Sequence, residues 1–458
     1  MSRGLLVRMI SIGFVAFLLI VPLLMVGGLV QERRKARDSV VQEIARSAAY
    51  AQTVTGPILV VPYVRRVSEQ QSEGGRAVLV TREVAGELRL LPQTFQLDGQ
   101  LTTQERQRGI YRARIFDAST RITGRFDVPA QYGVGPEAGS YQFGAPRLVL
   151  GISDVRGIGN ALAMQVNGAG VAVVPGTATD LLTSGVQAEV PPGSAATPQQ
   201  LEYAIDLPLQ GTGDFQVTPV GRESQVSLTS DWPHPSFVGE FLPRRREVST
   251  AGFTAEWQAS YFATNAEEKL SRCTVTGQKA DCAEFSALHF GVGFIDPVDQ
   301  YVKTDRAVKY GFLFIALTFG GFFLLEVLKR FSVHPVQYGL VGFSLALFFL
   351  LLLSLSEHLG FAAAYVVSAA ACAGLIGYYV THVLDSARIG VGFGAALAVL
   401  YALLYAILGS EDYALLTGAL LVFGVLAGVM VLTRRVDWYA VGRPTLPGAS
   451  APAGSGRE

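Results

Sequence analysis

MISIGFVAFLLIVPLLMVGGLV, residues 9–30, is the stretch that decides what kind of protein this chain is. It contains no charged side chain, and only Ser11 and Pro22 interrupt its apolar character. A helix needs about 20 consecutive apolar residues to cross the hydrocarbon core of a bilayer. A proline is tolerated in such a helix because neighbouring groups can bond the carbonyl that it leaves free. The stretch therefore predicts a transmembrane helix near the N-terminus.

Arg3 and Arg8 precede this stretch, and basic residues in that position are also typical of a cleavable signal peptide. Two features favour an uncleaved signal anchor. The apolar run is longer than the roughly 7–15 residues of a signal-peptide core, and no A-x-A-like cleavage site follows it. The chain continues instead with the charged run Gln-Glu-Arg-Arg-Lys at 31–35. We therefore expect residues 1–31 to remain on the protein as an anchor.

The charge of the chain is unevenly distributed. Charged residues make up 16% of the 458 residues, whereas an ordinary soluble domain carries about 25%. Residues 307–433 hold nine charged side chains, and residues 31–306 hold 27 basic and 30 acidic ones. The chain therefore combines a water-soluble block with an apolar one, which argues against a soluble cytosolic enzyme. The formal net charge of zero argues against nucleic-acid binding.

The apolar block contains five further stretches long enough to span a membrane, separated by segments with charge, proline or glycine. They are residues 308–328, 336–355, 361–381, 389–408 and 414–432. We therefore expect an α-helical membrane bundle of six transmembrane helices, made of the anchor and a five-helix bundle at 306–435. The remaining residues, 436–458, are expected to form a disordered cytoplasmic tail.

Basic residues in the short loops predict the orientation of this bundle, because such loops stay in the cytoplasm. One side collects eight basic residues: Arg3, Arg8, Lys329, Arg330, Arg388, Arg434, Arg435 and Arg443. The short loops of the other side carry only Glu357, Glu411 and Asp412. We expect both termini in the cytoplasm and the block 32–305 outside it, in a periplasm if the cell has one.

The extracytoplasmic block 32–305 is expected to be mainly β. In residues 32–51, apolar side chains recur every four positions, so this segment is expected to extend the anchor helix. After it, apolar side chains recur every two positions, as in a strand. Short strands are predicted at 58–63, 77–84 and 87–91, and a long one at 111–126. Residues 225–228 and 253–261 continue the pattern. A sandwich-like or extended-sheet domain is expected, but the strand order does not follow from the pattern.

Cys273 and Cys282 flank a short polar loop in this block. Outside the cytoplasm such a pair normally closes a disulfide. A metal site is the alternative, but no further cysteine or histidine lies nearby in the sequence, so the disulfide is favoured.

No strong catalytic motif is present in the sequence. It lacks a GxSxG elbow, an HExxH pair, a phosphate-binding GxxxxGK[ST] loop and a CxxC pair, and its five histidines are isolated. We therefore expect no enzymatic activity, no cofactor and no metal.

Two polar clusters remain as candidate sites in the membrane part. Glu357 and His358 follow the third span, and Glu411 and Asp412 precede the sixth, on the extracytoplasmic rim. The structural interpretation is loop solvation and an ion pair at the helix ends, and the functional one is a proton or cation site. A charged side chain costs little free energy at the membrane–water interface, so the structural interpretation is favoured. Glu326, one turn from Lys329 and Arg330, is expected to pair with them at the interface.

Trp232-Pro233-His234-Pro235-Ser236-Phe237 is the most unusual string of the outer block. The prolines fix the backbone and remove hydrogen-bond donors. One interpretation is a rigid crossover at a sheet edge with Trp232 and Phe237 buried, which is favoured. The other is a partner-facing loop formed by Trp232, His234, Pro235 and Phe237.

Taken together, several strings resemble the CreD family of cell-envelope integrity inner-membrane proteins, in order and in spacing. They are Gly56–Tyr63, Trp232–Phe237 with Gly239 and Phe241–Pro243, Pro297–Tyr301, Arg306–Gly311, Leu313–Phe319, His334–Tyr338, Leu351–His358, Glu411–Leu416 and Thr433–Tyr439. The resemblance covers nearly the whole chain and ends near Trp438.

The resemblance implies a multi-pass protein of a bacterial inner membrane with a large periplasmic domain. It further implies a non-enzymatic role in envelope maintenance or stress response, such as colicin tolerance or β-lactam response. The expected partners are the lipid bilayer and envelope proteins or cell-wall components, and no nucleic acid. The alternative is a transporter or ion-coupled membrane protein that uses the acidic and histidine rim. A hydrolase of envelope polymers would need carboxylates or a triad that converge only in space.

Overall fold

The fold was examined in a computed structural model. It describes residues 3–73, 76–135, 140–191, 195–276, 279–294, 299–329, 333–409 and 414–434. The chain forms two compact units, which are named here the membrane unit (Met1–Ala36 and Val298–Glu458) and the β unit (Arg37–Pro297). The sequence placed the corresponding boundaries at residues 31 and 305.

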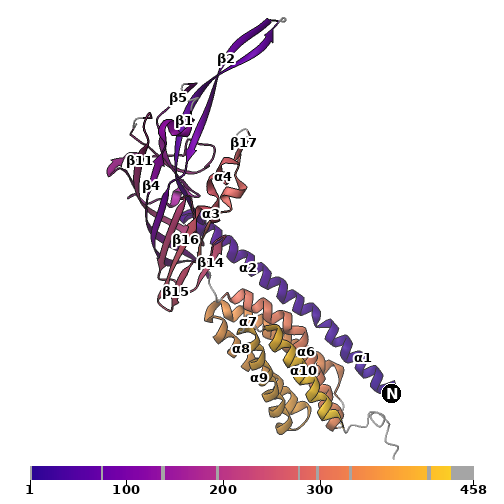
Figure 1. Ribbon diagram of the computed structural model, residues 1–458. Helices are drawn as coiled ribbons and strands as arrows, with labels where there is room; N and C mark the ends of the chain where they lie inside the picture. The colour runs from indigo at the N-terminus through magenta and orange to yellow at the C-terminus, as the bar shows by residue number, and fades with distance from the viewer. Residues whose placement is uncertain are drawn as a thin grey trace, which may run out of the picture. The chain divides into compact units, whose positions relative to one another are not determined.

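The membrane unit is built from long apolar helices (Figure 1). They are α1 (Arg3–Leu18), the first part of α2 (Ile20–Ala48), α6 (Gln300–Lys329), α7 (Pro335–Leu359), α8 (Phe361–Val383), α9 (Ala387–Gly409) and α10 (Ala414–Thr433). In the described residues, five spans are long and apolar enough to cross a membrane. The first of them, Met9–Ala48, joins α1 and α2. The sixth predicted span coincides with α10, whose apolar stretch Gly418–Val431 is shorter, so the number six remains a prediction.

Local sequence signals set the ends of these helices. At the start of α7, the His334 side chain accepts a hydrogen bond from Val336 N, and the Gln337 side chain accepts one from His334 N. This is a reciprocal cap, and Pro335 occupies a first-turn position where no N–H is needed. Gly360, with φ of 78°, separates α7 from α8. The termini of α7 therefore follow from residues that the sequence already displays.

Glycines allow α8 and α9 to approach each other closely. A Cβ at Gly377 would lie 3.4 Å from Gly394 Cα, and one at Gly390 would overlap the Thr381 hydroxyl. Small residues commonly permit such backbone contact between membrane helices. Gly392, between the two on α9, faces open space. Gly424 and Gly428 on α10 also face open space, although their GxxxG spacing is one that often permits close helix contact.

The β unit contains a nine-stranded and an eight-stranded sheet among its described residues. The first has the order β14 (Pro235–Gly239), β19 (Phe290–Phe294), β12 (Asp214–Thr218), β1 (Gln52–Glu73), β6 (Arg147–Ile152), β10 (Gly185–Glu189) and β9 (Val173–Pro175), with β2 (Arg76–Leu90) and β5 (Tyr141–Phe143) also paired to β1. The second has the order β15 (Arg245–Ser249), β16 (Gly252–Ser260), β13 (Glu223–Ser230), β3 (Thr94–Arg108), β4 (Tyr111–Val128), β11 (Gln199–Thr212), β7 (Ala163–Val166) and β8 (Ala169–Val171).

Alternating side chains of the two sheets form one hydrophobic core. A buried row crosses the second sheet through paired positions: Trp257, Val226, Leu97, Ile122 and Ile205. Phe116 of this sheet packs against Phe215 of the first, with ring centroids 5.9 Å apart. The mainly β domain expected from the period-two pattern is therefore present, as two packed sheets.

The three short strands predicted at 58–63, 77–84 and 87–91 lie in strands, but their number and length were wrong. β1 and β2 are long strands that pair from Leu59 with Leu90 to Glu73 with Arg76. Figure 1 shows them as a hairpin that extends beyond the rest of the β unit. Residues 81–85 of β2 are all exposed, so this part of the hairpin has both faces open to water and tolerates polar residues.

Short helices and a small hairpin complete the β unit. They are η1 (Ala130–Gly133), η3 (Val155–Gly157), α3 (Tyr261–Thr264), α4 (Ala266–Ser271), α5 (Ala283–Ser286), and β17 (Thr274–Thr276) paired with β18 (Lys279–Asp281). Leu270 of α4 and Phe285 of α5 are buried in the core, so both helices are fixed to the sandwich.

Candidate functional site

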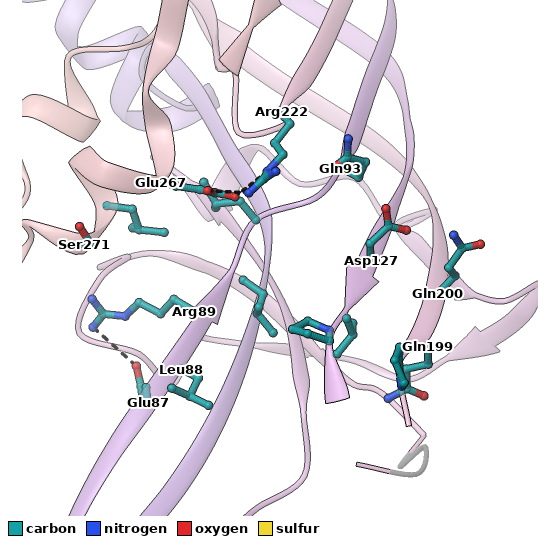
Figure 2. A pocket seen from close by; sticks show the side chains of 16 residues that line it. Glu87, Leu88, Arg89, Gln93, Asp127, Gln199, Gln200, Arg222, Glu267 and Ser271 are labelled. Atoms are coloured by element: carbon teal, nitrogen blue, oxygen red, sulfur yellow. Dashed lines mark hydrogen bonds and ion pairs between the residues drawn. The ribbon is translucent and has the colours of Figure 1, made fainter. Parts of the chain in front are cut away.

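A pocket of about 980 Å³ lies in the β unit, where segments of both sheets meet α4. Sixteen residues line it: Glu87, Leu88, Arg89, Leu90, Leu91, Gln93, Asp127, Val128, Pro129, Pro198, Gln199, Gln200, Arg222, Glu267, Leu270 and Ser271. Figure 2 shows Glu87, Leu88 and Arg89 on one side, with Asp127, Gln199 and Gln200 on the other. Its volume is at the upper end of what small-molecule pockets usually have.

The strand period explains how β2 contributes to this pocket. Leu88 and Leu90 pair with Val61 and Leu59 of β1 and pack against the hydrophobic core. Glu87 and Arg89 alternate with them and therefore point to the opposite face. The chain then turns, and Gln93 N donates to Arg125 O at 2.7 Å. This turn carries the chain from the first sheet into the second, and the pocket lies beside it.

Arg222 and Glu267 form a bidentate ion pair at the pocket. The guanidinium Nε and Nη2 donate to the two carboxylate oxygens at 2.9 and 3.0 Å, which is a bidentate contact. The hydrogen bond to Glu267 raises the pKa of Arg222 above its ordinary value. The guanidinium also lies 5.3 Å from the centroid of the Tyr261 ring. The pair joins the start of β13 to α4 and closes one end of the pocket (Figure 2).

The other charges of the pocket are also paired locally. Arg89 Nη2 lies 3.7 Å from Glu87 Oε2, which accepts a hydrogen bond from the Thr179 hydroxyl at 2.8 Å. Asp127 lies 3.3 Å from Arg125 Nε. Each basic group therefore has a carboxylate beside it. The pocket therefore offers hydrogen-bonding groups and apolar surface without a strong net charge. Such a surface is suited to binding a ligand.

The disulfide residues lie next to this pocket. Cys273 and Cys282 are joined in the structure, with Cα atoms 4.6 Å apart. Cys273 follows Ser271, the last residue of α4, by two positions, and Cys282 immediately precedes α5. Arg272 adds a contact to Glu284 at 3.5 Å. The cross-link therefore ties the helix that forms one wall of the pocket to the next helix.

The Trp232–Phe237 string lies away from this pocket and divides into two parts. Pro235 is the first residue of β14, an edge strand, where a missing N–H is tolerated. Phe237 packs edge-to-face on Phe253 and Trp257, as the structural interpretation expects. The Trp232 ring lies 3.6 Å from the Arg114 guanidinium, and its Nε1 donates to His234 O at 2.9 Å. His234 itself is exposed.

The rim cluster is only partly described by the structure. Glu357 accepts a hydrogen bond from the Tyr301 hydroxyl at 3.2 Å and lies 3.8 Å from Arg33 Nε, with 10% of its side chain exposed. His358 is exposed. Glu411 and Asp412 lie outside the described residues, so the meeting of all four side chains stays a prediction. For Glu357, the contacts match the expected ion pair at a helix end.

The sequence did not reveal two buried polar groups of the membrane unit. Glu326 is 6% exposed and accepts hydrogen bonds from the Tyr338 hydroxyl at 2.9 Å and from Val333 N at 3.4 Å. It was expected at the interface beside Lys329 and Arg330, and Arg330 lies outside the described residues. The buried Cys372 accepts a hydrogen bond from the Tyr401 hydroxyl at 3.1 Å.

The sequence also did not point to the pocket. Arg222 and Glu267 are 45 positions apart, and Glu87 and Asp127 belong to strands of different sheets. The alternation of Glu87 and Arg89 with leucines was visible, but it indicates a strand and not a site. In the described residues, no group of three or more histidine, cysteine or acidic side chains is arranged to hold a metal ion.

Comparison with known proteins gives two matches that extend over most of the chain. The family model described as inner membrane protein CreD matches residues 4–439. The curated inner membrane protein CreD of Escherichia coli strain K12 is 37% identical over 439 residues. That alignment covers 96% of this chain and 95% of the E. coli protein.

Proposed function

Because this chain belongs to the CreD family of inner membrane proteins, we propose that it acts in envelope maintenance or stress response without enzymatic activity. In this proposal the β unit lies in the periplasm and is the part that recognises a partner. The membrane helices hold it at the inner membrane. Colicin tolerance and the response to β-lactams are the phenotypes in which the role is expected to be visible.

The distribution of basic residues supports this orientation. Arg388 lies in the first turn of α9, Arg434 follows α10, and Glu357 lies near the end of α7. If the helices cross the membrane in alternating directions, the two arginines lie on one side of the bundle and Glu357 on the other. Loops with arginine and lysine stay in the cytoplasm. The β unit lies in the sequence between α2 and α6. The proposed orientation places both of its links to the membrane helices on the side opposite to the basic loops.

The pocket of the β unit is the observation that carries the proposal. It combines leucine side chains with three glutamine amides and with charges that are already paired, namely Arg222 with Glu267 and Arg89 with Glu87. A pocket of this size with apolar surface and a few polar groups is typical of an active or binding site, and in this proposal it recognises a partner. In this proposal the partner is located in the cell envelope.

A complementation experiment tests the proposal. A strain that lacks the gene is expected to show altered sensitivity to a β-lactam and to a colicin, and the wild-type gene is expected to restore it. The charge-removing double variant Arg222→Ala/Glu267→Ala should restore it poorly at equal membrane abundance. The exchanged pair, Arg222→Glu/Glu267→Arg, is the control for loss of the ion pair itself.

Two outcomes would count against the proposal. One is a deletion strain with unchanged growth, shape and drug sensitivity under every envelope stress tried. The other is full restoration by pocket variants, which would move the recognition surface away from the pocket.

A further inference from the structure

The outer edge of β2 is open where this strand lines the pocket. β2 pairs with β1 along one edge, from Leu90 outwards to Arg76. In the described part of the chain no strand pairs with its other edge. The backbone groups of Glu87, Leu88, Arg89 and Leu90 make no hydrogen bond there with described residues outside the β1–β2 ladder. Every second residue of an edge strand directs its N–H and C=O away from its neighbour. The stretch Glu87–Leu90, which lines the pocket, therefore carries backbone donors and acceptors that are open to an added strand.

The pocket beside this edge forms a groove that is lined by polar and apolar side chains. Leu88, Leu90 and Leu91 contribute from the β2 side, and Leu270 of α4 and Val128 of β4 contribute from the other walls. An exposed edge without a groove offers only backbone hydrogen bonds, whereas a groove also accommodates alternate side chains of an added strand. Its volume of about 980 Å³ leaves room for several residues of an extended chain.

The charges of the groove indicate which class of molecule fits it. Arg222 is engaged by Glu267, Arg89 lies beside Glu87, and Arg125 lies beside Asp127. A phosphate-bearing lipid or an anionic polymer would meet a carboxylate next to each guanidinium. A peptide backbone carries no net charge, and the amides of Gln93, Gln199 and Gln200 complement its N–H and C=O groups.

We propose that this groove binds an extended polypeptide segment, which adds to β2 as a further strand at Glu87–Leu90. The inference rests on the proposed recognition role of the β unit and names the chemical class of the partner. Backbone hydrogen bonds to the open edge supply affinity, and alternate side chains of the segment enter the leucine-lined groove. The disulfide-linked α4 forms the facing wall.

A direct test uses the full-length protein in lipid nanodiscs and a phage-displayed library of random nonapeptides. Selected peptides are expected to bind the wild-type protein and to lose binding to Gln200→Trp, which fills the groove from an exposed wall position. Gln225→Trp is the matched control, since Gln225 is exposed on β13 and does not line the pocket. Unchanged thermal unfolding of both variants shows that they are folded.

The backbone contacts are tested by replacing single peptide amides with esters, which removes one N–H donor at a time. Strand addition predicts that affinity falls about 2- to 10-fold at alternate positions only. A uniform or absent effect of the esters overturns the proposal. So does a selection that enriches no peptide for the wild type over Gln200→Trp, or saturable binding of glycan strands or phosphatidylglycerol vesicles to the groove in place of peptides.

Complementation with the same variants separates this inference from the proposed function. If peptides bind the wild-type protein and Gln200→Trp still restores the deletion strain, the groove binds peptides but the envelope role does not depend on that binding. If peptides fail to bind and Gln200→Trp also fails to restore the strain, the envelope role stands and the class of partner proposed here is wrong.

Discussion

Asp154 is the charged side chain that ties the end of α2 to the start of β1. Its carboxylate accepts hydrogen bonds from Arg156 Nε at 2.8 Å and from Tyr50 N at 3.0 Å, and 10% of the side chain is exposed. The Arg156 guanidinium in turn donates to Arg46 O at 2.7 Å, a carbonyl in the last turn of α2. The hydrogen bond from Arg156, followed by those from backbone N–H groups, lowers the pKa of Asp154 to about 2.

Replacing Asp154 by asparagine is expected to lower the free energy of unfolding of the β unit by roughly 2 kcal/mol at pH 7. The folded pKa lies below the unfolded value of 3.8, so this stabilisation is complete above about pH 5. It decreases as the pH falls through 4 and is lost near pH 2. Chemical unfolding at several pH values measures the difference between wild type and variant.

Asp206→Asn is the control for this prediction. Asp206 lies 3.5 Å from Arg121, but both side chains are at least half exposed, and such pairs contribute little. A difference between wild type and Asp154→Asn that stays constant from pH 7 to pH 2 would contradict the pKa assignment.

Glu357 distinguishes the structural interpretation of the rim from a transport role. Glu357→Gln keeps an acceptor for the Tyr301 hydroxyl and removes the charge facing Arg33. The structural interpretation predicts a loss of thermal stability worth about 1 kcal/mol and intact complementation. Arg33→Gln should have a similar effect, and the double variant should add little to either. If Glu357→Gln failed to complement while Arg33→Gln complemented, the result would favour the cation or proton site.

At the scale of elements, the disulfide is expected to hold α4 against the sandwich. Replacing Cys273 and Cys282 by serine should lower the free energy of unfolding of the β unit by about 2–3 kcal/mol. It should also weaken ligand binding in the pocket, because α4 forms one wall. Thiol labelling of the unfolded, unreduced protein should modify Cys372 alone of the three cysteines. Modification of all three would show that the disulfide does not form.

The α8–α9 interface gives a second prediction at this scale. Gly390→Ala would place a methyl group on the Thr381 hydroxyl and is expected to cost about 1–3 kcal/mol. Gly392→Ala, two positions along α9, meets open space and should cause no loss of stability. Thermal unfolding of both variants in detergent compares them. Equal effects of the two substitutions would mean that α9 does not face α8 through Gly390.

At the scale of the whole molecule, the orientation in the membrane is the main prediction. A fluorescent protein that matures only in the cytoplasm should be bright when fused to the C-terminus. Alkaline phosphatase inserted after Thr250, in the β15–β16 turn, should be active because that turn is expected in the periplasm. The opposite pair of results would reverse the orientation and place the pocket of the β unit in the cytoplasm.

The sequence by itself determined the membrane helices and the β character of the block between them. A run of about 20 apolar residues and an alternation of period two are local properties, and each is read within one element. The expected spans 336–355 and 361–381 lie inside α7 and α8, and the expected strand 111–126 lies inside β4. Family membership followed from strings whose order is also visible in the sequence.

Only the tertiary structure decided the strand pairings and the pocket. β1 pairs with β12 in parallel, Gln52 opposite Phe215, and no local pattern specifies which distant strand will be the neighbour. The pocket depends on such pairings, because they bring the end of β2, the start of β13 and α4 together. Arg222 meets Glu267 for the same reason. Local periodicity determines which face of each strand is buried, whereas which strands pair with each other depends on the whole sandwich.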